Sequence, residues 1–197
     1  MSSKVEKKIL DAAMEVVAEK KISGTRMHMI AEQAQMSQAS LHYHFSTKNE
    51  LMMALLDNLQ ESFTIDRKNY IDLENKNTDE NITGFFEQKK NEILNKKKYD
   101  YAQLDYWVQG TTNEEIRDKF RDTFNTWRNG ISEAIGKNHN MSPGKSKDLS
   151  MIPYVMVSLM MGASLQYLID EGSFDLDEYF KISESIINDL RSGKIHL

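Results

Sequence analysis

The sequence contains no cysteine and only two prolines. Without cysteine there are no disulfides, no thiol nucleophile and no cysteine-ligated zinc site. No apolar run reaches membrane-spanning length, and the polar residues 1–8 do not resemble a signal peptide. Strand-like alternation is also missing, so the patterns predict an all-α protein in the cytoplasm, with no membrane partner.

Residues 24–45 carry the most informative pattern, two short helical segments around a tight turn. Ile30 and Ala34 belong to the apolar face of the first segment, and Leu41 and Phe45 lie one turn apart in the second. A serine before the second segment is a natural N-cap. The pattern predicts a helix-turn-helix.

The second segment carries small and polar side chains on its first turns, where a recognition helix enters a major groove. We expect base contacts from Gln38, Ser40 and His42, with Ala39 among them. Residues on either side are expected to hold phosphates or support the contact: Thr25, Arg26, Tyr43, His44 and Lys48, with His28 able to reach bases or phosphates.

These residues also support a family resemblance. The run Ile30-Ala31, Ser37, Leu41-His42-Tyr43-His44-Phe45 and Lys48-Asn49-Glu50-Leu51 resembles the TetR family of transcriptional regulators. The resemblance covers roughly the first quarter of the chain. It implies a three-helix DNA-binding domain over residues 1–47 and a helical domain for effector binding and dimerisation over residues 48–197.

Two positions depart from the family pattern. Gln35 stands where the family usually has a glycine in the turn, which predicts a strained or reshaped turn. His42 stands where the family most often has tyrosine, so its contact with DNA would come from an imidazole.

The net charge of −5 is unusual for a DNA-binding protein. Residues 1–60 contain seven Lys or Arg and seven Asp or Glu, so the whole deficit lies beyond them. Because salt screens charges beyond about 8 to 10 Å, the local neutrality matters more than the total charge. We therefore expect modest non-specific affinity for DNA.

The remainder of the chain shows helical spacing throughout. Helices are predicted over residues 48–73, from Thr78, over 99–109, from a Thr112–Glu115 capping box, over 147–171 with a kink at Pro153, and over 175–191. The helix from residue 175 is expected to be capped by Asp175.

Aromatic and acidic residues crowd the middle helices and predict a small-molecule site. The expected lining residues are Phe63, Asp66, Tyr70, Phe86, Tyr99, Asp105, Tyr106, Trp107, Phe124, Trp127 and Tyr154. Ring faces and acidic neighbours favour a flat or cationic hydrophobic effector. The alternative interpretation is a collapsed aromatic core with the carboxylates in solvent.

The last two predicted helices are apolar on more than one face, and a second apolar face needs a partner. The resemblance implies a four-helix bundle with the same pair in a second copy. The expected interface consists of Val155, Leu159, Gly162, Gln166, Ile169, Tyr179, Ile182, Ile186 and Leu190.

The sequence thus favours a ligand-responsive repressor that binds a palindromic operator as a homodimer. A TetR-like DNA-binding protein without a small-molecule effector, acting through protein partners or DNA architecture, is the alternative. No nucleophile, base and orienting group share a motif, so an enzyme is not expected. Neither a cofactor nor a metal site is expected.

Overall fold

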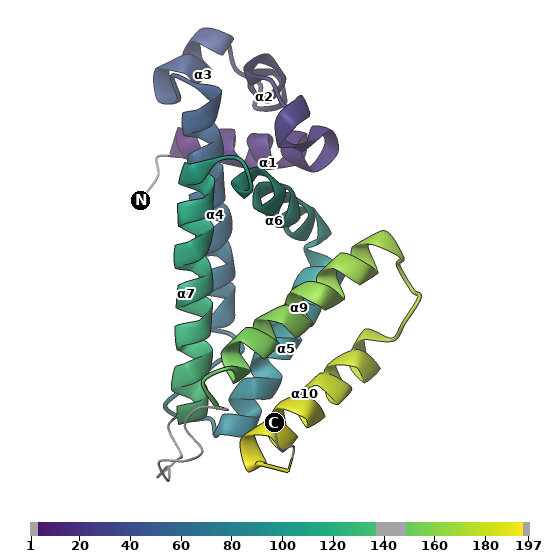
Figure 1. Ribbon diagram of the computed structural model, residues 1–197. Helices are drawn as coiled ribbons and strands as arrows, with labels where there is room; N and C mark the ends of the chain where they lie inside the picture. Colours follow the sequence, from purple (N-terminus) through teal and green to yellow (C-terminus); the bar gives the residue numbers. More distant parts are fainter. Residues whose placement is uncertain (1–3, 137–148, 195–197) are drawn as a thin grey trace. The chain divides into compact units, whose positions relative to one another are not determined.

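The computed structural model describes residues 4–136 and 149–194, and all regular structure in these ranges is helical (Figure 1). The helices are α1 (Lys4–Gly24), α2 (Met27–Gln33), α3 (Gln38–His44), α4 (Lys48–Arg67), α5 (Thr78–Asn95), α6 (Lys97–Gly110), α7 (Glu114–Gly136), α9 (Ile152–Ile169) and α10 (Leu176–Ser192). This confirms the all-α prediction.

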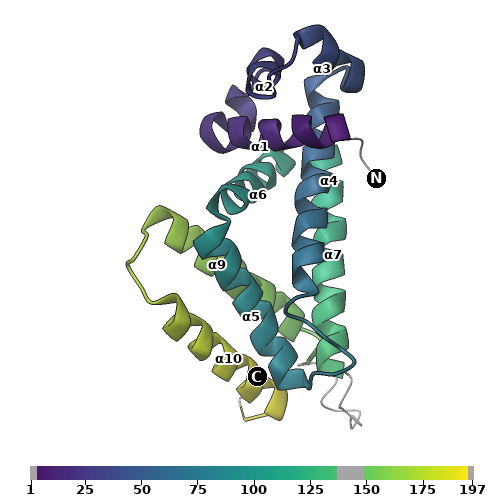
Figure 2. The ribbon, with the colours of Figure 1, turned by 180° about the vertical axis from the view of Figure 1, so that it is seen from behind.

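The chain divides into two compact units, and α4 and α7 contribute to both. The first unit comprises Met1–Thr64 and Lys96–Phe120. In it α1 packs against α2 and α6, and α2 packs against α3, as both ribbon views show (Figure 2). Helix α6 therefore belongs with the three N-terminal helices, so this unit extends beyond the predicted domain of residues 1–47.

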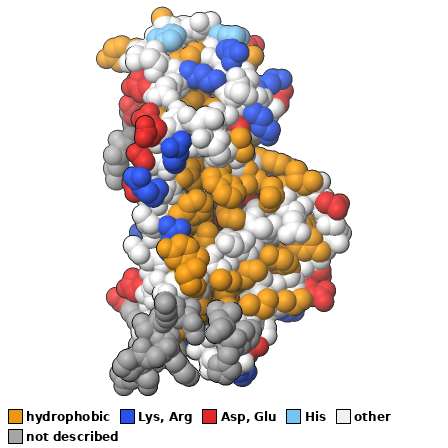
Figure 3. Space-filling view, viewed as in Figure 1, with side chains coloured by type: hydrophobic (Ala, Val, Ile, Leu, Met, Phe, Trp, Pro, Cys, Tyr) orange, Lys and Arg blue, Asp and Glu red, His pale blue; other side chains and the backbone are white. Residues whose placement is uncertain are grey.

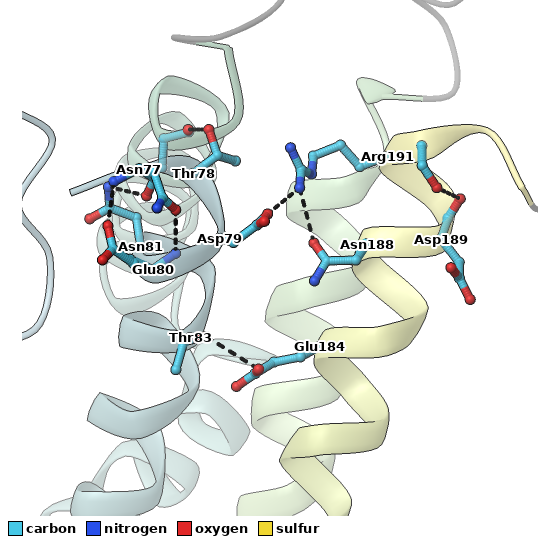
Figure 4. Close-up of polar contacts among 12 residues, drawn as sticks. Asn77, Thr78, Asp79, Glu80, Asn81, Thr83, Glu184, Asn188, Asp189 and Arg191 are labelled. Atoms are coloured by element: carbon cyan, nitrogen blue, oxygen red, sulfur yellow. Dashed lines mark hydrogen bonds and ion pairs between the residues drawn. The ribbon is translucent and has the colours of Figure 1, made fainter.

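The second unit comprises Ile65–Asn95 and Arg121–Leu197. Its helices α5, α9 and α10 each contact the other two. Apolar contacts such as Phe86 on Phe180, with ring centroids 5.4 Å apart, join α5 to α10. Polar contacts add to them: Thr83 donates a hydrogen bond to Glu184, and Arg191 pairs with Asp79 (Figure 4).

Two predicted helix starts are confirmed by their caps. The Ser37 hydroxyl accepts a hydrogen bond from the Ser40 amide at 3.1 Å. The Asp175 carboxylate accepts from the amides of Asp177 and Glu178 at 2.7 and 3.1 Å. Each side chain satisfies backbone N–H groups that have no partner inside the helix.

Other helix ends differ from the prediction. Helix α4 ends at Arg67, six residues before the predicted residue 73, because turns replace the helix there. Asn77, not Thr78, caps α5: its side chain accepts from the Glu80 amide, and the Glu80 carboxylate accepts from the Asn77 amide (Figure 4). In the same way Asn113, and not Thr112, caps α7 by accepting from the Ile116 amide.

Pro153 produces no kink, since α9 begins at Ile152 and the proline therefore lies in its first turn. A proline there removes no intrahelical hydrogen bond. The predicted start at residue 147 lies outside the described residues. Among the described residues, α9 is long and apolar enough to cross a membrane by length and composition, but 50% of it is buried inside the fold, as in a core helix.

Candidate nucleic-acid interface

The start of α3 presents the predicted base-contacting side chains to solvent. Leu41 on the opposite side of this helix is completely buried. Gln38, Ala39 and Ser40 are exposed, and the Ser37 cap fixes the backbone from which they project. The geometry is that of a short helix anchored on one face and available on the other.

The turn before α3 contains the predicted non-glycine strain. Gln35 has φ 50°, in the left-handed region that normally favours glycine. The Gln35 and Met36 amides donate to the carbonyls of Glu32 and Ala31 at 2.9 Å each, which holds the turn in this conformation. These hydrogen bonds keep the turn closed although residue 35 is not a glycine, and the left-handed backbone of Gln35 costs about 1 kcal/mol.

The end of α3 presents a second set of accessible groups. Tyr43 is 87% exposed, and its ring meets the edge of His44 at a centroid distance of 5.3 Å. Nδ1 of His42 lies 3.2 Å from the Ser46 carbonyl oxygen, which orients the imidazole while the residue stays exposed. His28 on α2 is also exposed.

Arg26, the residue before α2, is exposed as well. Its Nη1 donates to the carbonyl oxygens of Ser23 and Thr25 at 2.8 and 3.1 Å. These bonds use one of the two terminal nitrogens of a guanidinium that has five N–H donors. Further donors remain for a phosphate.

Thr25 corrects the predicted set of phosphate contacts. Its side chain is buried, and its hydroxyl donates to the Lys21 carbonyl at 2.7 Å. A buried, occupied hydroxyl is out of reach of a phosphate. Thr25 instead holds the end of α1, where Lys21 has φ 62°.

Lys48 also has an intramolecular role. Its Nζ donates to the Ile22 carbonyl at 2.5 Å, and the Ile22 amide donates to the Asp105 carboxylate at 2.6 Å. Burial and the nearby Arg26 lower the pKa of Lys48, while Asp105 opposes them. We call Ile22, Lys48 and Asp105 the junction cluster, since it joins the ends of α1 and α4 to α6.

Sequence reasoning missed the junction cluster. It assigned Lys48 to DNA and Asp105 to an effector, because neither residue has a local pattern that reveals a partner 26 or 83 positions away. The left-handed backbone at Lys21 could not be predicted either, because the residue at this position is neither glycine nor asparagine.

Helices α2 and α3 lie within a region that matches a known family model. Residues 9–55 match the model described as bacterial regulatory proteins, tetR family. This segment is similar to the N-terminal module of the TetR family. It contains α2 and α3 in full, together with most of α1 and the start of α4.

Solved structures share the fold over nearly the full length. A TetR transcription regulator from Haloarcula marismortui is 16% identical with a TM-score of 0.75, and 98% of each chain is covered. A protein from Saccharomonospora viridis, described as a transcriptional regulator and solved in complex with choline, is 21% identical with a TM-score of 0.80, covering 95% of this chain and 97% of that one. No curated protein matches the sequence.

The predicted effector residues are divided between the two units. Phe63, Tyr99, Asp105, Tyr106 and Trp107 belong to the same unit as the TetR-family module. Among them, Asp105 is part of the junction cluster, Trp107 is exposed, and Tyr106 is fully buried, with its hydroxyl donating to the Met52 carbonyl at 2.7 Å. Burial raises the pKa of Tyr106, so it is a neutral core residue.

The second unit holds the others: Asp66, Tyr70, Phe86, Phe124, Trp127 and Tyr154. Phe124 and Trp127 meet edge to face at 5.6 Å. Tyr154 is exposed under the Arg128 guanidinium, 4.6 Å from the ring centroid. Phe86 is buried against α10 and belongs to the core.

A buried polar network in this unit also escaped sequence reasoning. Nε of Arg67 donates to the Gln88 side-chain oxygen at 3.3 Å, and the Gln88 amide nitrogen donates to Glu92 at 2.9 Å. Nζ of Lys89 lies 3.2 Å from the other Glu92 oxygen. We call Arg67, Gln88, Lys89 and Glu92 the Arg67 network. Because Lys and Glu are rarely buried, the sequence of residues 88–92 predicts a position on the surface.

Of the predicted dimer residues on α9 and α10, four are exposed and the others are half-buried: the exposed ones are Gln166, Ile169, Ile182 and Ile186. Ile169 is 80% exposed and Ile182 54%. Hydrophobic side chains gather over α9 and α10 on the face drawn in Figure 3. Met156, Met160 and Ala163, on the other side of α9, are buried. The two apolar sides predicted from the sequence are therefore distinct, one covered and one exposed.

No group of three or more potential ligands for a metal ion occurs within residues 4–136 and 149–194.

Proposed function

We propose that this protein is a transcriptional repressor that binds a palindromic operator as a homodimer and is released by a small hydrophobic effector. The observation that carries the proposal is α3: a capped, anchored helix whose side chains Gln38, Ala39 and Ser40 are exposed within a TetR-family module. Exposed polar and small groups at the start of such a helix are suited to the edges of base pairs.

The uncovered apolar side of α9 and α10 supports the proposed homodimer. Isolated apolar side chains on a surface are ordinary, but Leu165, Ile169, Ile182 and Ile186 are all exposed on two adjoining helices. A second copy would cover them about a two-fold axis. The two modules would then occupy major grooves about 34 to 36 Å apart on a palindrome.

We expect release from DNA to depend on an effector that binds in the second unit. Such an effector must prefer the conformation that fits DNA poorly, since only differential affinity shifts an equilibrium. The sequence-based preference for a cationic effector stays a prediction; the Saccharomonospora viridis protein solved with choline is consistent with it. Cytoplasmic localisation is part of the same proposal.

The experiment starts by selecting bound sequences from random duplex DNA with the purified protein. A palindromic consensus, bound by two chains, is the expected result. Absence of any enriched sequence would contradict the proposal, as would a consensus bound by one chain.

Variants then test the division of roles on the selected operator. Gln38→Ala should relax base preference at one or two positions by about 1 to 3 kcal/mol each. Arg26→Gln should weaken binding to all sequences alike and reduce the salt dependence by about one counterion. Equal loss of sequence preference in both variants would contradict the assigned roles.

The effector part has a separate test. A calorimetric screen of metabolites and drugs, followed by operator release, should find compounds that do both. If no compound in a broad panel binds, a DNA-binding protein without a small-molecule effector becomes the better account.

A further inference from the structure

His42 lies on the exposed side of α3, one helical turn after Gln38. Residues four apart in a helix share a face, so these two side chains project from the same side. Toward the core, Leu41 is completely buried and Phe45 is 7% exposed. The Phe45 amide donates to the Leu41 carbonyl at 2.9 Å, which closes the last turn of the helix. The backbone from which His42 projects is therefore fixed.

The ring of His42 is oriented by a hydrogen bond to the backbone. Nδ1 lies 3.2 Å from the Ser46 carbonyl oxygen, while the residue stays exposed to solvent. A carbonyl oxygen carries no hydrogen, so Nδ1 is the donor in this bond. In a neutral imidazole one nitrogen is a donor and the other an acceptor, and the hydrogen bond of one nitrogen decides which. The remaining nitrogen, Nε2, is therefore an acceptor in the neutral ring.

The Ser46 residue is itself held in place at the start of α4. Its amide and hydroxyl both donate to one oxygen of the Glu50 carboxylate, at 2.9 and 2.8 Å. The Glu50 amide donates to the Thr47 hydroxyl at 3.1 Å, so residues 46–50 form a cap on α4. The bonds from Ser46 lower the pKa of Glu50, which keeps this carboxylate charged. The imidazole on α3 is thus oriented from the beginning of the next helix.

An acceptor at Nε2 of His42 can pair with only one kind of group on DNA. Each base pair presents one hydrogen-bond donor in the major groove, the exocyclic amino group of adenine or cytosine. The other polar groups there, such as guanine O6 and thymine O4, are acceptors. Phosphate oxygens are acceptors too, so a neutral Nε2 has no hydrogen bond to make with them. The orientation of this ring therefore favours the amino group of a base.

We propose that His42 reads one base pair of the operator through Nε2, which accepts a hydrogen bond from the amino group of adenine or cytosine. Ser46 is the positioning residue, since its carbonyl holds the hydrogen of the ring on Nδ1. The amino group lies at different places across the groove in A·T and T·A pairs, so an acceptor fixed in space distinguishes them. This inference rests on the proposed function and adds the chemical class of one group that the protein recognises.

The first test determines the tautomer of His42 in the full-length protein without DNA. Nitrogen-15 chemical shifts of labelled histidine distinguish a protonated ring nitrogen from an unprotonated one, and His42→Phe assigns the signals. At about pH 8, where an ordinary imidazole is neutral, Nδ1 should be protonated and Nε2 unprotonated. The exposed His28 is the internal reference in the same spectrum. The opposite tautomer at His42 would overturn the inference, whatever DNA the protein binds.

The second test removes single groups from the selected operator. Purine in place of adenine, or pyrimidin-2-one in place of cytosine, lacks only the exocyclic amino group. At one position in each half-site, this replacement should weaken binding by the unmodified protein about three- to tenfold more than binding by His42→Phe. The matched control uses 7-deazaadenine and 7-deazaguanine, which lose the N7 acceptor instead and should affect both proteins equally.

Two variants of Glu50 test the positioning role of Ser46. Glu50→Ala removes the acceptor of the Ser46 amide and hydroxyl, so the His42 ring should populate both tautomers and the effect of the amino group should decrease. Glu50→Gln keeps an acceptor oxygen and should retain the tautomer and the effect. Circular dichroism confirms that each variant is folded. Identical spectra and identical base preference in Glu50→Ala and the unmodified protein would contradict this role.

The DNA replacements can also overturn the inference. If loss of N7 weakens only the unmodified protein while loss of the amino group affects both proteins equally, His42 is a donor and the inference fails. No difference between the two proteins on any replacement would overturn it as well. In either case a palindromic consensus bound by two chains leaves the proposed function standing. Absence of any consensus would remove the proposed function and this inference together.

Discussion

Two polar clusters among the described residues, one in each unit, differ in what they hold in place. In the junction cluster, both backbone groups of Ile22 are paired, the amide with Asp105 at 2.6 Å and the carbonyl with Lys48 at 2.5 Å. In the Arg67 network, the cation at one end makes a single hydrogen bond of 3.3 Å. The junction cluster fixes the backbone near the end of α1, whereas the Arg67 network joins the end of α4 to α5 through side chains.

The energetic reason lies in the cost of unpaired groups. A buried donor or acceptor that loses its partner costs about 1 to 3 kcal/mol, and an uncompensated buried charge costs more. Removal of a central acceptor from either cluster should therefore lower the stability of the protein.

The largest effect is expected at the centre of the Arg67 network. Glu92→Leu removes the buried carboxylate that accepts hydrogen bonds from Gln88 and Lys89 and that also favours the charge of Arg67. The free energy of unfolding should fall by about 3 to 5 kcal/mol, measured by urea denaturation. The double variant Lys89→Met with Glu92→Leu should recover part of this loss; no recovery would mean that Glu92 acts through packing alone.

The junction cluster should show the next largest effect. Asp105→Ala leaves the Ile22 amide without its acceptor and should lower the free energy of unfolding by about 1 to 3 kcal/mol. Operator affinity should also fall, since the end of α1 precedes the DNA-binding helices. Asp105→Asn keeps an acceptor and should lose less in both measurements. Equal losses in the two variants would contradict an acceptor role.

Arg67→Met should change stability least among the charge-removing substitutions. Replacement of a poorly compensated cation by an apolar side chain of similar length is often neutral, so we expect a change within about 1 kcal/mol. Urea denaturation without ligand is the measurement. A loss near that of Glu92→Leu would show that Arg67 is a structural residue, and would weaken the contrast between the two groups.

The smallest effect concerns Glu184, which accepts from Thr83 at 3.2 Å in the second unit (Figure 4). Burial and Glu87 raise the pKa of Glu184 above its ordinary value, so the folded state binds a proton more readily than the unfolded state. The contribution of this group to stability therefore falls as the pH rises through the folded pKa.

Glu184→Gln removes this titration. Relative to the unmodified protein, this variant should therefore be more stable at pH 7 than at pH 5, which means that the difference in free energy of unfolding is larger at pH 7. Denaturation curves at both values, taken at fixed salt, provide the check. A constant difference between the two proteins would contradict the raised pKa.

Local patterns gave good predictions where the physical cause is local. The Ser37 and Asp175 caps, the non-glycine turn at Gln35 and the helix-turn-helix spacing all depend on residues within four positions of one another. The predicted caps of α5 and α7 were each one residue away from the observed ones. A threonine and an asparagine stand side by side at both places, and only the geometry decides which of them caps the helix.

The predicted effector site was less successful, since it depended on packing between distant segments. Aromatic richness does not distinguish a core residue such as Tyr106, whose hydroxyl is bound to Met52, from a residue beside a cation, such as Trp127 next to Arg67. Asp105 looked like a ligand group because its partner lies 83 residues away.

By itself, the sequence determined the helical class, the helix-turn-helix spacing and the two apolar sides of α9, because periodicity and capping depend on near neighbours. Only the tertiary structure decided which polar groups are buried and which of those are satisfied. Burial and pairing of Ile22 with Lys48 and Asp105, or of Arg67 with Gln88, arise when segments remote in the chain pack together. No local pattern carries that information.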